Sequence, residues 1–339
     1  MPSVKSVRTD RELECPTIDR VLREKGAQLV LLPEGVSEDE LAREVADADL
    51  LLMCYTPITA KVINAATKLK AIVKYGVGID AIDIPAARAR SIPVVNIPEY
   101  AEETVAEGAF MLMIALAKKL LPISREMQRT GWAWPEQQWL GADIAGKTLG
   151  LVGVGRIGRS MARMAGAGFR ARVLGYDPYV PREVMAQHGV TKVDSLEEML
   201  PQCDYVSLHS VLNDGSRYLI GAQELELMKP SAFLINVSRG ALVDEMALLA
   251  ALKAGKIAGC GLDVYSQEPL DHERHPLREL FAMDNVVIFP HLTFYTKEAM
   301  DRLEEDTLAR CFEALEGKPL LVRSKDPRLT GQTAGVRFS

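Results

Sequence analysis

The chain has 339 residues, of which 48% are apolar and 25% charged, and its formal net charge is −6. This length suits two domains of ordinary size, and the composition is typical of globular proteins with hydrophobic cores. The acidic balance, without a basic block, argues against a nucleic acid or an anionic membrane surface as a partner. Five scattered cysteines without C-x-x-C spacing indicate a reducing compartment and no structural metal.

The N-terminal segment is too charged for a signal peptide, so the sequence predicts a cytoplasmic protein. The most apolar run, residues 109–117, is far shorter than a membrane span and continues into two lysines. We therefore expect a buried helix there and no membrane partner.

Short apolar runs alternate with helical patterns along the first hundred residues. Strands are expected at 27–32, 50–54, 71–74 and 94–96, with a helix at 38–46. Alternating strands and helices predict a parallel sheet, and thus a first α/β domain over about residues 1–100.

A long helical segment, 104–130, leads toward a glycine-rich unit. Later strands are expected at 205–208, 233–236, 258–263 and 286–288, which complete a second, doubly wound parallel sheet. The last helical pattern covers 297–315. The polar segment 324–339 is expected to be a mobile tail.

The glycine-rich unit has the pattern of a dinucleotide site. Gly153, Gly155 and Gly158 form a G-x-G-x-x-G turn after a short apolar strand. The first glycine makes a tight turn, the second lets the backbone approach a pyrophosphate, and the third permits close helix packing. The helical segment 157–167 would point its N-terminal amides at the phosphates. Because strands are expected on both sides, the pattern predicts a Rossmann site.

An acidic residue completes this site. Asp177 follows the expected strand 171–176, about twenty residues after the last glycine. A carboxylate there accepts hydrogen bonds from both ribose hydroxyls and repels a 2′-phosphate. The sequence therefore predicts NAD as the cofactor and favours it over NADP.

Three further motifs contain one candidate catalytic residue each. They are LINVSRGALVDEMAL with Arg239, GLDVYSQEPL with Glu268 and NVVIFPHLTFYT with His291. With the glycine turn, they resemble the D-isomer-specific 2-hydroxyacid dehydrogenase family, in the same order and at similar spacing, from about residue 50 to 315. Taken singly, each of the three could be a surface or turn residue. Together they follow strands of one sheet, where open α/β sheets bind ligands.

The resemblance implies an NAD-dependent enzyme that interconverts a D-configured 2-hydroxy acid and its 2-keto acid. It also implies two doubly wound domains, with a Rossmann NAD domain (101–293) inserted into a flavodoxin-like substrate domain (1–100 with 294–323). His291 would be the general acid and base, Glu268 would orient its ring, and Arg239 would bind the substrate carboxylate or polarise its carbonyl. Hydride transfer belongs to the nicotinamide.

Other positions carry over from the family one at a time. Val77 and Gly78 would bind the substrate carboxylate through their amides, and Tyr55 would line the substrate side or belong to the core. The positions expected on the cofactor, beyond the glycines and Asp177, are Thr104, Arg156, Ile157, His209, Val237, Ser238 and Asp263. The other histidines are expected to be surface or structural residues.

The chain departs from family patterns at positions that bear on substrate. Cys54 stands where phosphoglycerate dehydrogenases have an arginine that helps hold a phosphate, which argues against a phosphorylated substrate. Lys74 replaces the commoner arginine, and the bulky residues 292–295 resemble the D-lactate dehydrogenase branch.

The family also commonly dimerises through the segment around the long helix, so a homodimer is expected, with the nearby tryptophans as core or subunit contacts. Two alternatives remain. One is an NAD(H)-sensing scaffold similar to the corepressor branch, and the other is a formate- or phosphite-type dehydrogenase.

Overall fold

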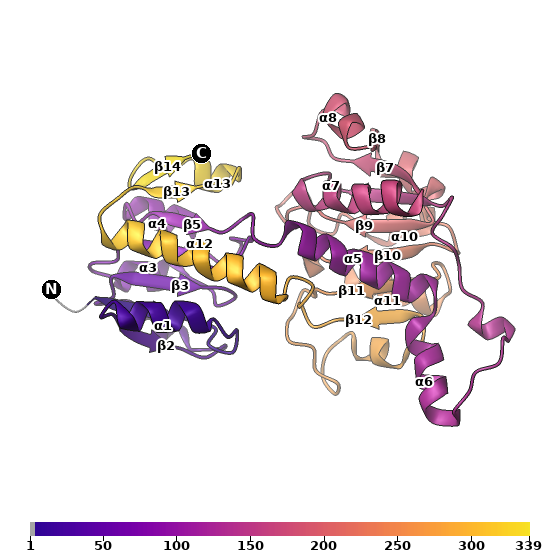
Figure 1. Ribbon diagram of the computed structural model, residues 1–339, viewed down its shortest axis with the longest axis horizontal. Helices are drawn as coiled ribbons and strands as arrows, with labels where there is room; N and C mark the ends of the chain where they lie inside the picture. Colours follow the sequence, from indigo (N-terminus) through magenta and orange to yellow (C-terminus); the bar gives the residue numbers. More distant parts are fainter. Residues whose placement is uncertain (1–3) are drawn as a thin grey trace. The chain divides into compact units, whose positions relative to one another are not determined.

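A computed structural model describes residues 4–339 of the chain. The chain divides into two compact units (Figure 1). The first unit combines the residues up to Ala101 with Thr296–Ser339, and the second unit is Glu102–Tyr295. Both units are α/β folds with a parallel sheet, as the sequence predicts.

The first unit is built on a five-stranded sheet in the order β2-β1-β3-β4-β5, with all neighbours parallel. This 2-1-3-4-5 order is the flavodoxin-like doubly wound order. Every residue of β3 and β4 is buried, and all but Lys74 are apolar. The strands are β1 (Lys5–Arg8), β2 (Gln28–Leu31), β3 (Leu50–Met53), β4 (Ala71–Lys74) and β5 (Val94–Asn96).

Helices cover both faces of this sheet. Helices α1 and α12 pack on each other, and α12 also contacts β3 and β4, whereas α2, α3 and α4 pack side by side. Thr296 caps α12 by accepting a hydrogen bond from the Ala299 amide, so this helix begins where the sequence predicts. The bounds are α1 (Pro16–Glu24), α2 (Glu38–Val45), α3 (Ala60–Ala65), α4 (Ile84–Ala89) and α12 (Lys297–Leu315).

The C-terminal segment differs from the expectation of a mobile tail. Its residues form helix α13 (Pro327–Thr330) and strand β14 (Val336–Phe338), which pairs in parallel with β13 (Leu320–Val322). Leu329 is fully buried, and the polar residue Gln332 is also buried. The segment is polar in composition, but two of its side chains are buried and anchor it to the first unit.

The second unit is built on a seven-stranded parallel sheet in the order β12-β11-β10-β9-β6-β7-β8. The chain starts in the middle at β6, runs to β8 at one edge, and returns to β9 on the other side of β6. This reversal is the topological switch point at which doubly wound sheets bind ligands. The strands are β6 (Thr148–Val152), β7 (Arg172–Tyr176), β8 (Thr191–Lys192), β9 (Tyr205–Leu208), β10 (Phe233–Asn236), β11 (Gly259–Leu262) and β12 (Val286–Ile288).

Alternate residues of these strands enter two separate cores, one on each face of the sheet. In β10, Leu234 belongs to the core with α9, α10 and α11, whereas Ile235 belongs to the core with α5, α7 and α8. This alternation follows from the period of two in a strand. The helices are α5 (Glu102–Ala117), α7 (Arg156–Arg163), α8 (Arg182–Gln187), α9 (Leu196–Met199), α10 (Ala222–Leu227) and α11 (Glu245–Lys253).

The long helix expected over residues 104–130 is two helices, α5 and α6 (Leu120–Thr130). The break falls at Lys119, which has a left-handed backbone with φ of 50°. Pro122, the third residue of α6, explains the break. Proline has no N–H to donate to the carbonyl of Lys118, four residues earlier, so α5 cannot continue through this position, whereas the first turn of a new helix tolerates proline. No helix in the described part of the chain is long and apolar enough to cross a membrane.

Candidate active site

The three candidate catalytic residues follow three neighbouring strands of the second unit. Register places the last residues of β10, β11 and β12 side by side, since Asn236 pairs with Leu262 and Leu262 with Ile288. Because the carboxyl ends of parallel strands meet at one edge of a sheet, the loops with Arg239, Glu268 and His291 emerge together.

His291 and Glu268 are in direct contact. The Nδ1 atom of His291 lies 2.8 Å from an Oε atom of Glu268, whose other oxygen accepts the Tyr265 amide at 2.8 Å. Burial acts to raise the pKa of Glu268, but bonds from His291 and Tyr265 and the nearby His291 and Arg239 charges outweigh it, so this pKa lies below its usual value. An ionised carboxylate only accepts, so Nδ1 holds the hydrogen and Nε2 is the atom left for proton exchange.

Asp263 fixes the loop that holds His291. Its side chain is fully buried and accepts the amides of Leu292 at 2.8 Å and Thr293 at 3.1 Å, and it also bonds to the Thr293 hydroxyl. His291 itself has a left-handed backbone, with φ of 57°, that only a few per cent of non-glycine residues adopt. Two charge-assisted bonds directly after it therefore hold an unusual conformation in place.

Arg239 lies on a loop packed tightly against the loop of Glu268. A Cβ atom on Gly240 would come within 2.0 Å of the Tyr265 carbonyl carbon, so only glycine allows this approach. The Asn236 amide group donates to the Arg239 carbonyl at 2.9 Å, and the Arg239 guanidinium donates to the Ser238 carbonyl at 2.7 Å. The backbone of the arginine is thus fixed at the end of β10.

The glycine turn has the geometry of a dinucleotide site. Gly153 has a φ of 93°, and a Cβ on Gly158 would lie 2.4 Å from the Gly153 carbonyl oxygen. By contrast, a Cβ on Gly155 would meet nothing within 4 Å. Gly155 is also the N-cap of α7, and it offers no side chain to the first amides of that helix. Open space at the N-terminus of a helix fits a pyrophosphate.

Asp177 lies at the end of β7 and is bonded to the same turn. One carboxylate oxygen accepts the Val154 amide at 2.9 Å, and the other accepts the Tyr179 and Val180 amides at 2.9 and 3.2 Å. A carboxylate has about four acceptor positions, so it can still take a ribose hydroxyl. The residue therefore both orders the glycine turn and presents a negative charge beside it.

His209 lies half-buried at the switch point. A Cβ on Gly153 would lie 2.7 Å from the His209 carbonyl carbon, which brings the loops after β6 and β9 into contact. Its Nε2 lies 2.9 Å from the Ser207 hydroxyl, while Nδ1 meets no partner in the described residues. Burial lowers the pKa of His209 to about 4, so the ring is neutral at pH 7.

The remaining cofactor-side candidates are distributed around the same edge. Thr104 is buried on α5, one turn before Gly108, whose Cβ would overlap the Thr293 side chain at 2.4 Å. This close approach packs α5 against the His291 loop. Val237 is buried, and the Ser238 hydroxyl donates to the Leu208 carbonyl at 2.8 Å. Arg156 forms an ion pair with Glu102 at 3.1 Å, next to Ile157 in the first turn of α7.

In the first unit, a buried aspartate organises the loop that contains Tyr55. Asp10 accepts the amides of Cys54 at 2.9 Å, Tyr55 at 3.0 Å and Thr56 at 3.1 Å. It is 1% exposed and has a φ of 54°, a left-handed conformation that aspartate tolerates better than most residues. No local sequence pattern reveals this role of Asp10, because its partners lie 44 to 46 positions away.

Lys74 lies under this loop at the end of β4. Its Nζ donates to the Cys54 carbonyl at 2.5 Å, lies 3.1 Å from the Cys54 sulfur and stands 5.5 Å from the centre of the Tyr55 ring. In the turn after β4, Val77 is exposed and Gly78 is half-buried. The ends of β3 and β4 therefore bring together a buried ammonium group, an aromatic ring and a backbone turn.

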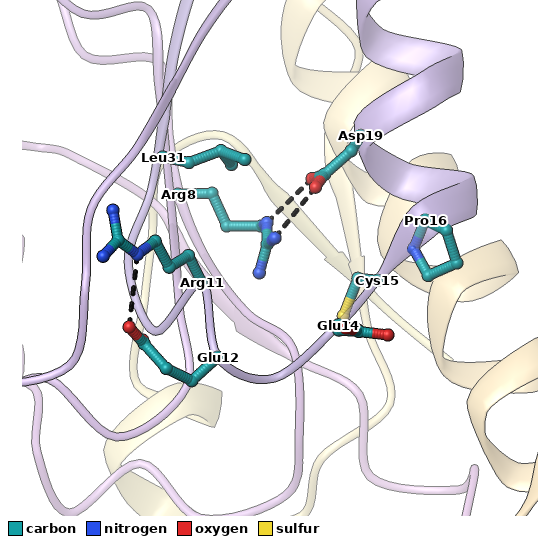
Figure 2. Close-up of a pocket in the computed structure, with 8 residues that line it drawn as sticks. All are labelled: Arg8, Arg11, Glu12, Glu14, Cys15, Pro16, Asp19 and Leu31. Atoms are coloured by element: carbon teal, nitrogen blue, oxygen red, sulfur yellow. Dashed lines mark hydrogen bonds and ion pairs between the residues drawn. The ribbon is translucent and has the colours of Figure 1, made fainter.

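A separate open hollow of about 400 Å³ lies beside α1 in the first unit (Figure 2). Its buried cation, Arg8, donates to both carboxylate oxygens of Asp19 at 2.8 and 2.9 Å and to the Leu13 carbonyl at 3.1 Å. Arg11 pairs with the adjacent Glu12 at the rim. Because these charges are paired with one another, the hollow has the character of a structural ion-pair site.

Three other histidines have structural surroundings. His275 is buried, bonding to the Gln267 carbonyl and the Leu277 amide, and His272 stacks on Phe281 at 3.8 Å. His188 ends helix α8.

These features define a dinucleotide-binding unit with an Arg, Glu and His group at one sheet edge. Residues 110–293 match the family described as D-isomer specific 2-hydroxyacid dehydrogenase, NAD binding domain. The chain belongs to this family, whose members are NAD-dependent 2-hydroxyacid dehydrogenases. The expected family, fold class, enzyme class and NAD cofactor are confirmed.

Individual relatives are named for different substrates. A glyoxylate reductase of Korarchaeum cryptofilum is 41% identical over 79% of this chain and 80% of its own length. A D-3-phosphoglycerate dehydrogenase of Methanocaldococcus jannaschii is 39% identical over 83% of this chain, which spans about half (52%) of that protein. The crystal structure of D-lactate dehydrogenase from Aquifex aeolicus, complexed with NAD and lactic acid, has a TM-score of 0.82 at 29% identity, covering 92% of this chain and 96% of that one.

Proposed function

We propose that the protein reduces an unphosphorylated 2-keto acid to the D-2-hydroxy acid with NADH, and catalyses the reverse reaction with NAD. The observation that carries this proposal is the His291–Glu268 hydrogen bond of 2.8 Å beside Arg239. A histidine oriented by an ionised carboxylate is suited to proton exchange near neutral pH, which carbonyl reduction requires.

In this proposal His291 is the general acid. The Glu268 carboxylate orients the ring through Nδ1, and the Nε2–H donates its proton to the carbonyl oxygen as that oxygen becomes negative. In the oxidative direction the neutral Nε2 accepts the proton from the hydroxyl group. Asp263 keeps the ring in position by holding the next two residues of the loop.

Arg239 supplies the second part of the site. Its planar guanidinium matches a carboxylate or a polarised carbonyl, and it is charged at any physiological pH. In the first unit, the amides of Val77 and Gly78 are proposed to bind the substrate carboxylate, with Tyr55 as a lining residue.

NAD is proposed to occupy the edge of the second sheet. The pyrophosphate would lie at Gly155 with Arg156 and Ile157, and the ribose at Asp177. Thr104, Val237, Ser238 and Asp263 would face the nicotinamide end, and His209 the adenine side. When bound, the nicotinamide supplies or accepts the hydride.

The unphosphorylated substrate is proposed from the surroundings of Cys54. The nearest cation, Lys74, is 5% exposed, and its ammonium group is bonded to the Cys54 carbonyl and sulfur. A phosphate carries up to two charges and binds best to several free donors or a guanidinium fork. A cation already held by backbone and thiol is a poor substitute for such a fork.

The experiment for this proposal is NADH oxidation against glyoxylate, hydroxypyruvate, pyruvate, phenylpyruvate and 3-phosphohydroxypyruvate. Hydroxyacetone serves as a control that matches hydroxypyruvate without the carboxylate. We expect turnover of at least one unphosphorylated acid and none of hydroxyacetone. Fast turnover of the phosphorylated acid would refute the Cys54 argument, and silence with intact NADH binding would favour the NAD(H)-sensing scaffold.

A homodimer is the proposed assembly, and helix α6 supports it. This helix has no buried residue, and the segment around it exposes Leu120, Trp132, Trp134 and Leu140 by 56 to 69%. An isolated helix of this length is marginal in water, so a second copy is the expected cover. Sedimentation equilibrium should give twice the chain mass of 37.3 kDa, and a single chain mass at micromolar concentration would contradict the proposal.

The proposed compartment is the cytoplasm. All five cysteines are buried free thiols, which suits a reducing environment.

A further inference from the structure

We propose that the C-terminal tail, residues 326–332, positions the substrate turn, defined as Gly76–Asp80. Arg328 and Gln332 act as positioning residues, because they hold the turn and do not touch the substrate themselves. The inference rests on the proposed function insofar as Val77 and Gly78 bind the keto acid. Its structural part is independent of that role.

The first contact joins the tail directly to the turn. Both terminal nitrogens of Arg328 lie 3.3 Å from one carboxylate oxygen of Asp80, two residues after Gly78. The same guanidinium is held by Asp326 at 2.7 and 3.0 Å, and Asp326 also caps α13 through the Arg328 amide at 2.9 Å. The guanidinium is thus oriented toward Asp80 by its own helix.

The second contact reaches the turn through strand β5. Gln332 is buried, and its side-chain amide accepts from the Val94 N–H at 2.7 Å and donates to the Val94 carbonyl at 2.8 Å. This pair of bonds reproduces a backbone ladder at the edge of the sheet. Gln332 therefore fixes the first residue of β5.

Strand β5 in turn holds the other end of the turn. The Asn96 side chain donates to the Val77 carbonyl at 2.6 Å, and the Ile97 amide donates to the Gly76 carbonyl at 3.0 Å. The Val77 and Gly78 amides thus lie between two anchors, one at Asp80 and one at Asn96. The tail is connected to both of them.

The tail is itself attached to the first unit. Leu329 is fully buried, and Arg88 of α4 donates to the Arg328 carbonyl at 3.0 Å. A Cβ on Gly331 would lie 2.8 Å from an Arg88 nitrogen, so the packing there is close. A segment attached at these points can transmit its position to the turn.

The test uses the full-length chain with Arg328→Gln, Asp80→Asn, the double variant and Arg328→Lys. Arg337→Gln is the matched control, because Arg337 is an exposed arginine that lies beyond the tail in β14 and pairs with Glu313 of α12 at 2.7 Å. Hydrogen exchange of a peptide covering residues 75–82 reports on the turn without requiring activity. KM for the best keto acid, KM for NADH and kcat report on whether the turn takes part in substrate binding.

An exposed ion pair is worth about 0.2 to 1 kcal/mol, which corresponds to roughly 1.4- to 5-fold. We expect exchange in the turn and KM for the keto acid to rise within that range in Arg328→Gln, Asp80→Asn and the double variant alike. KM for NADH and kcat should not change, Arg328→Lys should restore most of the effect, and Arg337→Gln should match the parent protein.

Unchanged exchange in Arg328→Gln, or an equal rise in Arg337→Gln, would overturn the positioning role. Faster exchange with an unchanged keto-acid KM would overturn its link to substrate. If the parent protein turns over no keto acid, that result counts against the proposed function, while the exchange measurement still decides whether the tail holds the turn.

Discussion

Replacing His291 with glutamine is expected to lower kcat for keto-acid reduction by about 10²- to 10⁴-fold, the usual contribution of a positioned general acid. Glutamine keeps a hydrogen-bond donor of similar reach, but it cannot transfer a proton near pH 7. Binding of NADH should remain close to that of the parent protein, because His291 follows β12 at one edge of the sheet, whereas the glycine turn and Asp177 follow β6 and β7, beyond β11, β10 and β9.

The measurements are single-turnover NADH oxidation and NADH fluorescence titration. His188→Gln is the matched control, since His188 is an exposed histidine at the end of helix α8 in the same unit. Parent-like kcat in His291→Gln would remove the histidine from catalysis. Parallel loss of turnover and NADH affinity would instead indicate that the His291 loop, and not the proton, was disturbed.

The Rossmann unit could be predicted because its signals agree at every level. A short apolar strand, glycines at fixed offsets and an acid after the next strand all lie within about thirty residues, as this motif requires. The structure shows a separate physical reason for each glycine: a positive φ at Gly153, open space at Gly155 and backbone contact at Gly158. Backbone constraints that act within a short segment can be predicted from the sequence.

Strand β1 could not be predicted, because it depends on contacts that are distant in the sequence. It reads KSVR, and its last residue is an arginine that is 1% exposed. A buried guanidinium is stable only with partners, and here they are Asp19 of α1 and backbone carbonyls. Hydrophobic pattern cannot reveal such pairing, because the compensating charge is 11 residues away.

The clustering of the three candidate catalytic residues could be predicted from the sequence, whereas the side chains that support their loops could not. Arg239, Glu268 and His291 each follow a strand, and parallel strands bring their ends together. Two carboxylates order loops that follow strands. The sequence indicates a cofactor contact for Asp263, and it indicates no role for Asp10. Their partners are loop amides from other strands, and such contacts are settled only by tertiary structure.

Replacing Asp177 is expected to shift cofactor preference toward NADPH. A carboxylate facing a 2′-phosphate is a like-charge contact that costs several kcal/mol, and each 1.4 kcal/mol is a factor of ten. Removing the charge should raise the ratio of kcat/KM for NADPH over NADH by about 10²-fold. Initial rates with both cofactors at a saturating keto acid measure this ratio.

Asp177 also orders the glycine turn, so removing its whole side chain would change both the charge and the turn. Two variants separate these two effects. Asp177→Asn removes the charge and keeps one oxygen, which can accept the Val154 amide while the Tyr179 and Val180 amides lose their acceptor; Asp177→Ala leaves all three amides without this acceptor. Both variants should relax the preference, and the alanine should weaken NADH binding more than the asparagine, because it also loses the bond to the glycine turn. Asp194→Ala is the matched control, because this exposed acid after β8 pairs with Arg182 at 3.2 Å. An unchanged cofactor ratio in Asp177→Asn would show that the carboxylate does not face the ribose, and its role would then be confined to holding the turn.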